Sequence, residues 1–225
     1  MKKEELDTLC SVHIRDCGLM PYRPALDLQL KLVEQRQAGD IGDTVLLLEH
    51  EPVITLGARQ TANKLLSTPD ELAAKGIDLV DIRRGGGATA HNPGQLVFYP
   101  ILHLQQARLG INAYIRKLEH IGLELLLRLG VDSGRKKGFP GLWVDTRKIA
   151  SIGVRVSKFV TYHGMAININ NDLSIFTHFI PCGLDGVQMT SVLEETATEY
   201  DMTDVKRRLS DLLRKHLSFN REAPK

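Results

Sequence analysis

The sequence has little of what marks secreted, membrane-spanning or nucleic-acid-binding proteins. Three cysteines in 225 residues are an odd and low number, which disfavours a disulfide framework and suits a reducing compartment. No apolar run approaches the roughly 18 residues of a spanning helix, and the opening Met-Lys-Lys-Glu-Glu-Leu-Asp lacks the apolar segment of a secretory signal. Basic residues exceed acidic ones by only two, 29 against 27, which disfavours a nucleic-acid partner. We therefore expect a cytoplasmic protein that binds neither membrane nor nucleic acid.

Apolar and charged contents of 43 % and 25 % are ordinary, so we expect a single catalytic domain over residues 1–225. Predicted strands and helices interleave, and many strands are joined by short turns. This order favours the α+β class, a mixed β-sheet flanked by helices, over a doubly wound parallel sheet. Strand patterns fall at 11–15, 44–49, 53–56, 79–82, 95–102, 142–145, 148–156 and 162–169. Helix signals fall after Pro24, at 70–75, at 111–129, after Ser191 and near 205–213.

Two details of this pattern are specific enough to test. The helix that opens at Pro24 carries Leu28, Leu32 and Gln35 on one side. Pro100, inside a predicted strand, indicates either an edge strand or a strand end, because proline cannot donate a ladder hydrogen bond.

Three consecutive glycines, Gly85, Gly86 and Gly87, follow a predicted strand within the segment 83–95. Such glycines let the backbone approach a ligand closely and expose N–H groups. A turn that only connects two strands has the same pattern. The segment is no phosphate-binding Walker loop, because Gly-Lys-Ser/Thr is missing. Nor is it a dinucleotide fingerprint, because a strand and not a helix follows the glycines.

Cys182 lies between Pro181 and Gly183, a context typical of a turn. A thiol there is either reactive or simply structural. Cys10 and Cys17 are weaker candidates for chemistry. Lys148 opens a predicted strand, and taken alone it is interpreted as a solvated strand end.

Histidines and a basic triplet complete the candidates. His91, His163 and His178 lie near glycines or near Cys182, so one of them is a candidate base for the thiol. A structural hydrogen bond is the alternative, and we prefer it for His178. No histidine or cysteine spacing resembles a zinc site, so no metal is expected. The basic triplet at 135–137 predicts a solvated loop, or a contact with an acidic protein partner.

Taken together, five blocks resemble the lipoyl(octanoyl) transferase family of the lipoate/biotin ligase superfamily. In chain order they are Leu48-Glu-His-Glu-Pro-Val-Ile-Thr-Leu-Gly57, Arg84-Gly-Gly-Gly-Ala-Thr-Ala-His91-Asn-Pro-Gly-Gln95, Lys148-Ile-Ala-Ser-Ile-Gly153, His163-Gly-Met-Ala166 and Pro181-Cys-Gly183. The resemblance covers roughly residues 44 to 192. Ala90 stands where the family usually has an aromatic residue, and Asn92 where glycine is common. Both departures concern the shape of an acyl pocket.

This resemblance implies transfer of an octanoyl group from octanoyl-acyl carrier protein to a lysine of a lipoyl domain, without a cofactor. The implied acceptors are the lipoyl domains of 2-oxoacid dehydrogenase complexes and the glycine cleavage H protein. By position, Cys182 is the nucleophile that forms an acyl thioester, and Lys148 is its partner. The implied octanoyl site comprises Arg84, Gly85, Gly86, Gly87, Ala88, Thr89, Ala90, His91, Ser151, Ile152, Gly153, Gly164, Met165 and Ala166.

Three other functions compete with this one. An ATP-dependent lipoate-protein ligase on the same fold is the nearest, but its adenylate chemistry needs no nucleophilic cysteine, so the Pro-Cys-Gly block favours the transferase. An idle relative that only binds carrier or lipoylated domains has no need of both Cys182 and Lys148. A cysteine hydrolase would use His163 or His178 as its base.

Overall fold

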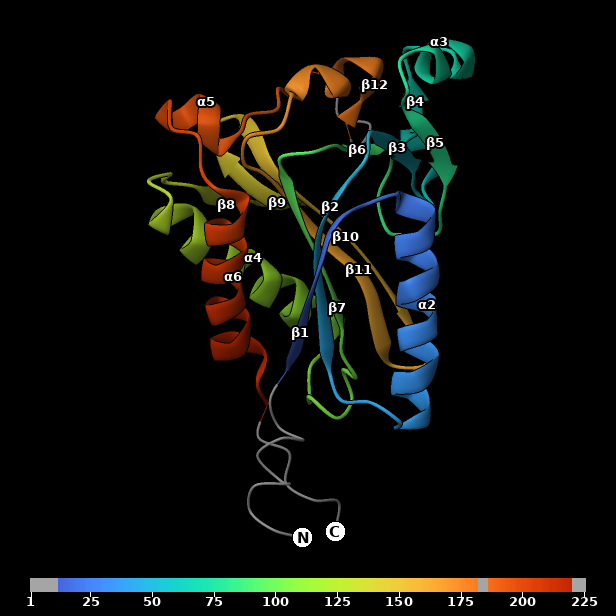
Figure 1. The fold of residues 1–225 in the computed structure, drawn as a ribbon, viewed down its shortest axis with the longest axis vertical. Coiled ribbons are helices and arrows are strands. Elements are labelled where there is room, and N and C mark those ends of the chain that lie inside the picture. The colour runs from blue at the N-terminus through green and yellow to red at the C-terminus, as the bar shows by residue number, and fades with distance from the viewer. Residues whose placement is uncertain (1–11, 182–185, 220–225) are drawn as a thin grey trace, which may run out of the picture.

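The computed structural model describes residues 12–181 and 186–219. A long seven-stranded sheet runs through the molecule, with two helices on one face and one on the other (Figure 1). Helices α4 (Ile111–Arg128) and α6 (Met202–Leu217) cover the first face, and α2 (Tyr22–Ala38) covers the second. The α+β class with a mixed sheet flanked by helices is therefore confirmed.

The large sheet has the strand order β1-β2-β7-β11-β10-β9-β8. β1 runs parallel to β2, and every other neighbouring pair is antiparallel. The strands are β1 (His13–Met20), β2 (Thr44–His50), β7 (Gln95–Ile101), β8 (Gly134–Lys136), β9 (Phe139–Val144), β10 (Arg147–Ser157) and β11 (Val160–Asn168). Pro100 lies one residue before the end of β7 and pairs with Val45. It marks a strand end and not an edge, because β7 is an interior strand.

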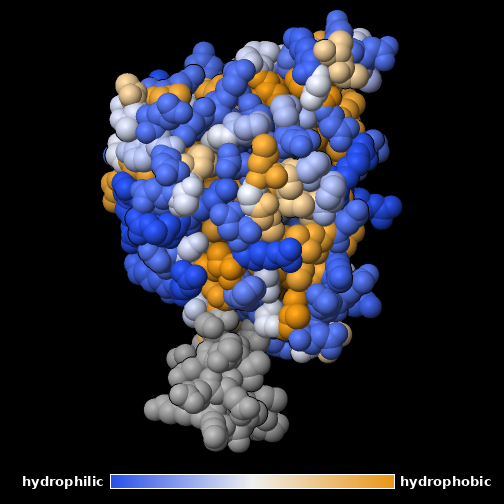
Figure 2. Space-filling model, viewed as in Figure 1, coloured by the Kyte–Doolittle hydropathy of each residue, from blue (hydrophilic) through white to orange (hydrophobic). Residues whose placement is uncertain are grey.

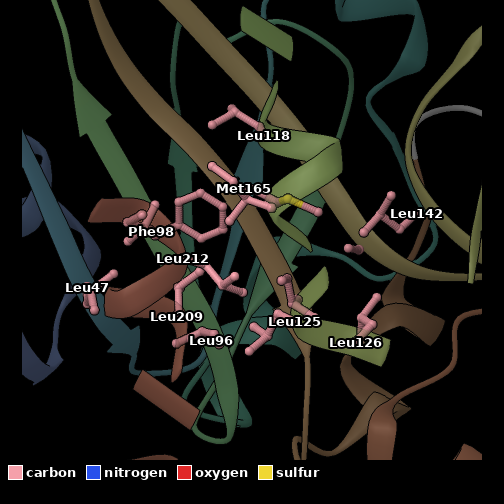
Figure 3. Close-up of a cluster of buried hydrophobic side chains, with 14 of the residues drawn as sticks. Leu47, Leu96, Phe98, Leu118, Leu125, Leu126, Leu142, Met165, Leu209 and Leu212 are labelled. Carbon is pink, nitrogen blue, oxygen red and sulfur yellow. The ribbon is translucent and has the colours of Figure 1, made fainter. Parts of the chain in front are cut away.

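The main core lies between this sheet and helices α4 and α6. Leucines of both helices, among them Leu118, Leu125, Leu209 and Leu212, are fully buried against side chains of the sheet (Figure 3). Each fully buried leucine stabilises the fold by roughly 1.5–3 kcal/mol. The apolar spacing that predicts a helix at 111–129 therefore reflects packing on the sheet, and the helix ends at Arg128.

Helix α2 begins at Tyr22 and buries a face that includes polar residues. Its buried positions are Tyr22, Ala25, Gln29, Val33 and Arg36. The predicted face of Leu28, Leu32 and Gln35 lies at the half-buried margin. The difference arises because the polar residues find partners inside: Gln29 Oε1 accepts the backbone N–H of His163 at 2.8 Å, and Arg36 Nε donates to Asp43 Oδ1 at 2.8 Å.

A smaller group of short elements lies at one end of the large sheet (top of Figure 1). Its strands form one sheet of order β5-β3-β6 and one pair, β4 with β12. These elements are β3 (Val53–Leu56), η1 (Gln60–Ala62), β4 (Lys64–Leu65), α3 (Pro69–Ala74), β5 (Asp78–Asp81), β6 (Thr89–His91), η2 (Leu173–His178), β12 (Phe179–Ile180) and α5 (Val192–Thr196). The predicted helix start after Ser191 is confirmed, since Ser191 Oγ accepts the N–H of Glu194 at 3.2 Å.

The basic triplet is exposed, as expected, but only Lys137 lies in a turn. Arg135 and Lys136 belong to the exposed edge strand β8. Arg135 Nε lies 3.0 Å from Glu119 Oε2, and Lys136 Nζ lies 4.7 Å from the centroid of the Trp143 ring. Consecutive basic side chains give no strand signal in the sequence. Hydrogen bonding to β9 holds Arg135 and Lys136 in a strand.

The surface in view is mixed in character. Figure 2 shows hydrophilic side chains over most of this face, with apolar ones gathered between α6 and α2. Among the described residues, no helix combines the length and the apolarity that crossing a membrane requires.

Candidate active site

Strands β6, β10 and β11 bring three of the sequence blocks to one place. Gly153 pairs with Gly164, and Ser151 with Ala166, across the β10–β11 ladder. The strands and the start of α2 enclose a narrow pocket of about 40 Å³. Ten of the residues implied by the resemblance line it: Arg84, Gly86, Thr89, His91, Ser151, Ile152, Gly153, Gly164, Met165 and Ala166.

The other four residues of that set lie elsewhere. Gly85 lines a separate, wider groove. Gly87 packs on Ala62, whose carbonyl oxygen would lie 2.4 Å from an added Cβ. Ala88 and Ala90 belong to the small core around Ile54 and Phe176. Because side chains alternate along a strand, Ala90 faces away from the pocket that its neighbours Thr89 and His91 line.

Two glycines allow the close approach that shapes the pocket. A Cβ on Gly164 would lie 2.2 Å from the carbonyl oxygen of Phe98, and one on Gly153 would lie 2.9 Å from Arg84 Cδ. Arg84 is buried, and its Nη2 donates to the carbonyl oxygen and to Oγ1 of Thr55 at 2.9 Å each. This guanidinium therefore ties the glycine segment to β3.

Five buried rings gather at the closed side of the pocket: Tyr22, His50, His91, Tyr99 and His163. His50 Nε2 lies 2.8 Å from the Tyr99 hydroxyl, and His91 Nδ1 lies 2.7 Å from Gln95 Oε1. His163 adopts a positive φ of 54°, which is uncommon outside glycine and asparagine.

All three histidines are held neutral. Burial lowers the pKa of His50 to about 4. Burial, reinforced by the positive charge of Arg84, lowers the pKa of His163 to about 3. Burial also lowers the pKa of His91 well below its usual range. The three imidazoles around the pocket are therefore uncharged near pH 7, so the guanidinium of Arg84 is the charged group of its wall. His163 is too weak a base there to ionise a thiol.

Sequence reasoning missed Tyr22, His50 and Tyr99. Tyr22 and His163, whose side chains lie 3.5 Å apart, are separated by 141 positions in the chain. Only His50 carried a signal, because it stands within the first block of the resemblance, where it received no role. No local spacing predicts the other two.

Lys148 is buried, with 3 % of its surface exposed, so its interpretation as a solvated strand end was wrong. A bulge between Lys148 and Ala150 interrupts the pairing with β9. The Lys148 backbone N–H donates to the carbonyl oxygen of Gln188 at 2.8 Å, and its own carbonyl accepts the N–H of Thr190 at 3.0 Å. Its Nζ lies 5.5 Å from the centroid of the Trp143 ring. These contacts bury the Lys148 side chain, which the pattern of residues along β10 alone would place in solvent.

A wider groove of about 590 Å³ adjoins the narrow pocket and is lined by Lys148. The two cavities share Gly86, Ile152 and Gly153 as wall residues. The groove combines an apolar wall, which includes Ile111, Ile115 and Val154, with a basic one. The basic residues are Arg59, Arg83 and Arg155. A narrow pocket that adjoins a wide groove lined by Lys148 suits an acyl chain that arrives attached to something larger.

Cys182, the expected nucleophile, lies outside the described residues, as does Cys10. The described chain resumes at Gly186 and meets Lys148 at Gln188, six positions after Cys182 in the sequence. Cys17 lies in β1, where burial raises the pKa of its thiol. For His178 the preferred structural role is confirmed, because its Nδ1 lies 2.8 Å from Ser67 Oγ.

Comparison with known proteins defines the family. Residues 21–214 match the model of the lipoyl protein ligase A/B catalytic domain, and the chain belongs to this family. It is 43 % identical to the octanoyltransferase of Desulfovibrio desulfuricans over 192 residues, which are 85 % of this chain and 81 % of the relative. The octanoyltransferase of Dictyoglomus thermophilum is 41 % identical over 199 residues, which are 88 % of this chain and 84 % of the relative.

Solved structures agree on the fold. A lipoate-protein ligase A bound with ATP superposes with a TM-score of 0.68 at 16 % identity, over 96 % of this chain and 89 % of that one. A bipartite lipoate protein ligase from Thermoplasma acidophilum gives 0.66 at 16 % identity, over 91 % and 84 %. The expected lipoate ligase fold is thus confirmed. At 16 % identity this similarity is evidence of the fold alone.

Proposed function

We propose that this chain is an octanoyltransferase of protein lipoylation, which moves an octanoyl group from octanoyl-acyl carrier protein to the lysine of a lipoyl domain. The observation that carries the proposal is that the narrow pocket adjoins the groove lined by buried Lys148. The octanoyltransferase relatives, about 40 % identical over most of the chain, support the same reaction.

In the first half of the reaction, the thiolate of Cys182 attacks the carbonyl carbon of the octanoyl thioester. A new S–C bond to Cys182 forms and the bond to the carrier's sulfur breaks. The Lys148 ammonium gives its proton to the departing carrier thiolate, so Lys148 is neutral when the second half begins. Only about 3 % of an ordinary cysteine is ionised at pH 7. Raising that to about three-quarters requires roughly 2.7 kcal/mol of preferential stabilisation. An ammonium about 4 Å away supplies energy of that order at an intermediate dielectric, and Lys148 is assigned that role.

In the second half, the lysine amine of the acceptor attacks the octanoyl-cysteine. The N–C bond forms, the S–C bond breaks, and Lys148 takes up one amine proton as the thiolate is restored. One residue thus serves both half-reactions. Donor and acceptor use the same site in turn, so the outer groove must admit two different protein-borne arms.

The octanoyl chain is assigned to the narrow pocket together with the adjoining part of the groove, against Ile152, Met165 and Ala166, because about 40 Å³ alone does not hold eight carbons. The basic wall of the groove, with Arg59, Arg83 and Arg155, suits an acidic carrier protein. The acceptors are lipoyl domains of 2-oxoacid dehydrogenase complexes and the glycine cleavage H protein. We assign the protein to the cytoplasm, because a reaction that depends on a free thiol suits a reducing compartment.

Intact mass measurement tests the intermediate directly. After incubation with octanoyl-acyl carrier protein, the protein gains one octanoyl group that hydroxylamine removes. Cys182→Ala abolishes the gain, and Cys17→Ala, in β1, leaves it unchanged. A thioester adduct that forms on the Cys182→Ala protein at the rate of the unaltered protein would overturn the proposal.

The ATP-dependent ligase remains the alternative, because solved structures with this fold include ligases. A ligase would modify a lipoyl domain with free lipoate only when ATP is added, and would survive loss of Cys182. A cysteine hydrolase would release free octanoate without an acceptor as fast as the transfer occurs. The low basicity of His163 disfavours that reaction.

A further inference from the structure

Away from the candidate active site, three ligand-type side chains converge between α4 and α6. His120 and Glu124 stand one turn apart on α4, and His216 stands near the end of α6. One donor atom from each lies within 4.8 Å of the other two. The helices lie side by side (Figure 1), on a side of the molecule where Figure 2 is mainly hydrophilic.

Two of the separations between these atoms, one to each oxygen of Glu124, are close to those around a tetrahedral ion. His120 Nε2 lies 3.3 Å from Glu124 Oε1, and His216 Nε2 lies 3.2 Å from Glu124 Oε2. Two ligands of one zinc ion, each about 2.1 Å from the metal, stand roughly 3.4 Å apart. An ion can therefore enter the cluster with small side-chain movements and no movement of either helix.

A second observation points the same way. The Nε2 atom of His216 is buried and lies 3.2 Å from Glu124 Oε2, but the contact does not have good hydrogen-bond geometry. A buried nitrogen without a hydrogen bond is costly, and a metal ion satisfies it. The His120 and His216 rings meet edge to face, 4.9 Å between centroids, so both can present Nε2 to one point.

We propose that His120, Glu124 and His216 form a zinc site that joins α6 to α4. Two imidazoles and one carboxylate are a ligand set that zinc accepts, with water in the fourth position. The side chain of His120 is half exposed, at 51 %, which leaves a route for the ion and that water. The role assigned to the site is structural, because none of the three residues lines either cavity of the candidate active site.

Lys215 makes the proposal specific. Its Nζ lies 3.2 Å from both oxygens of Glu124 and so competes with a metal ion for the same carboxylate. Removing this ammonium must strengthen zinc binding if Glu124 is a ligand. If the cluster is only a set of ion pairs, the same change creates no zinc affinity.

The test uses the full chain, stripped of metal and with its thiols alkylated so that cysteine cannot bind zinc. Zinc alone is titrated against a chromogenic chelator, and thermal stability is followed in parallel. We expect one equivalent to bind and raise the melting temperature. His120→Ala and His216→Ala each lower the affinity at least roughly tenfold, and Lys215→Met raises it. His13→Ala, an exposed histidine of β1, changes nothing.

Three results would overturn the site: no saturable binding, equal affinity in His120→Ala and the unaltered protein, or no gain in Lys215→Met. His120 is exposed enough for its substitution to leave the fold intact, so the test does not depend on the more buried His216. Magnesium serves as the negative control, because it prefers oxygen ligands.

Discussion

The backbone N–H of Lys148 donates a hydrogen bond of 2.8 Å to the carbonyl oxygen of Gln188. The Lys148 carbonyl oxygen in turn accepts the N–H of Thr190 at 3.0 Å. The bonds hold a buried lysine against the chain segment that follows Cys182 in the sequence. They connect the third block of the family resemblance to the segment that follows the fifth block in the sequence. The predictions below begin from this arrangement.

Replacing Lys148 by alanine should shift the pH profile of Cys182 alkylation upward, toward the pH near 8.5 at which a free cysteine ionises. Loss of the nearby ammonium removes the stabilisation of the thiolate. Turnover should fall by about 10²–10⁴, because the proton acceptor is lost as well. Iodoacetamide labelling is followed by peptide mass in a Cys10→Ser, Cys17→Ser background. A Lys148→Arg protein, which keeps a cation, is the matched control. If the pH profile of alkylation is the same in Lys148→Ala as in the unaltered protein, Lys148 does not form an ion pair with the thiolate.

Ser151→Leu should shorten the acyl chain that the enzyme accepts. Ser151 lines the narrow pocket, and a leucine there takes up space that we assign to the octanoyl chain. Because one methylene of fit is worth roughly 10–200-fold in specificity, transfer of octanoyl should fall relative to hexanoyl by at least that factor. Rates with both acyl carrier substrates measure it.

The control for that experiment is Ala90→Ser. Ala90 departs from the family pattern, which raised the expectation of an altered acyl pocket. Its side chain lies in the small core with Ile54 instead. We expect the ratio of octanoyl to hexanoyl transfer to stay unchanged; a changed ratio would mean that Ala90 shapes the acyl site after all.

Gly164→Ala should destabilise the protein by roughly 1–3 kcal/mol or more, since a Cβ would meet the Phe98 carbonyl oxygen at 2.2 Å. Gly42→Ala is the matched control, because nothing lies within 4 Å of its added Cβ and its φ is not positive. Urea unfolding at pH 7 compares the two. Equal midpoints would contradict the close packing of β11 on β7.

Stability should fall as the pH drops from about 6.5 toward 4. His50 and His163 ionise near pH 4 and 3 in the folded protein, because burial disfavours their charged forms. The unfolded chain binds these protons near pH 6.5 and is favoured below that pH. Each histidine contributes a slope of up to about 1.4 kcal/mol per pH unit between those limits, and no penalty above pH 6.5.

His163→Asn tests the assignment. Asparagine tolerates the positive φ of this position and does not titrate. Between pH 7 and pH 5 the unfolding free energy of the unaltered protein falls, and in His163→Asn this fall should be smaller by up to about 2 kcal/mol. That amount is close to what one histidine contributes between pH 6.5 and pH 5. A pH dependence identical to that of the unaltered protein would show that His163 is protonated equally in both states.

Local patterns in the sequence predict the elements better than the site. The apolar spacing at 111–129 reappears as α4, the strand patterns at 142–145 and 148–156 reappear as β9 and β10, and the glycine segment leads into β6. Periodicity succeeds there because each element buries one regular face. It fails at Lys148, whose cover comes from Gln188 and Thr190 forty residues later, and at Tyr22, whose ring neighbours lie in β2, β6 and β11.

Because α6 is the last helix of the described chain to be synthesised, the main core cannot be completed until α6 has been translated. Leu209, Leu212, Leu213 and Leu217 of α6 close the same core that contains Val45 and Leu47 of β2. This face of the sheet is therefore covered in two steps, first by α4 and then by α6, and the second step comes more than 160 residues after β2, from position 50 to position 217. A nascent chain can form local hairpins before that point, but the main core is completed only when α6 has left the ribosome.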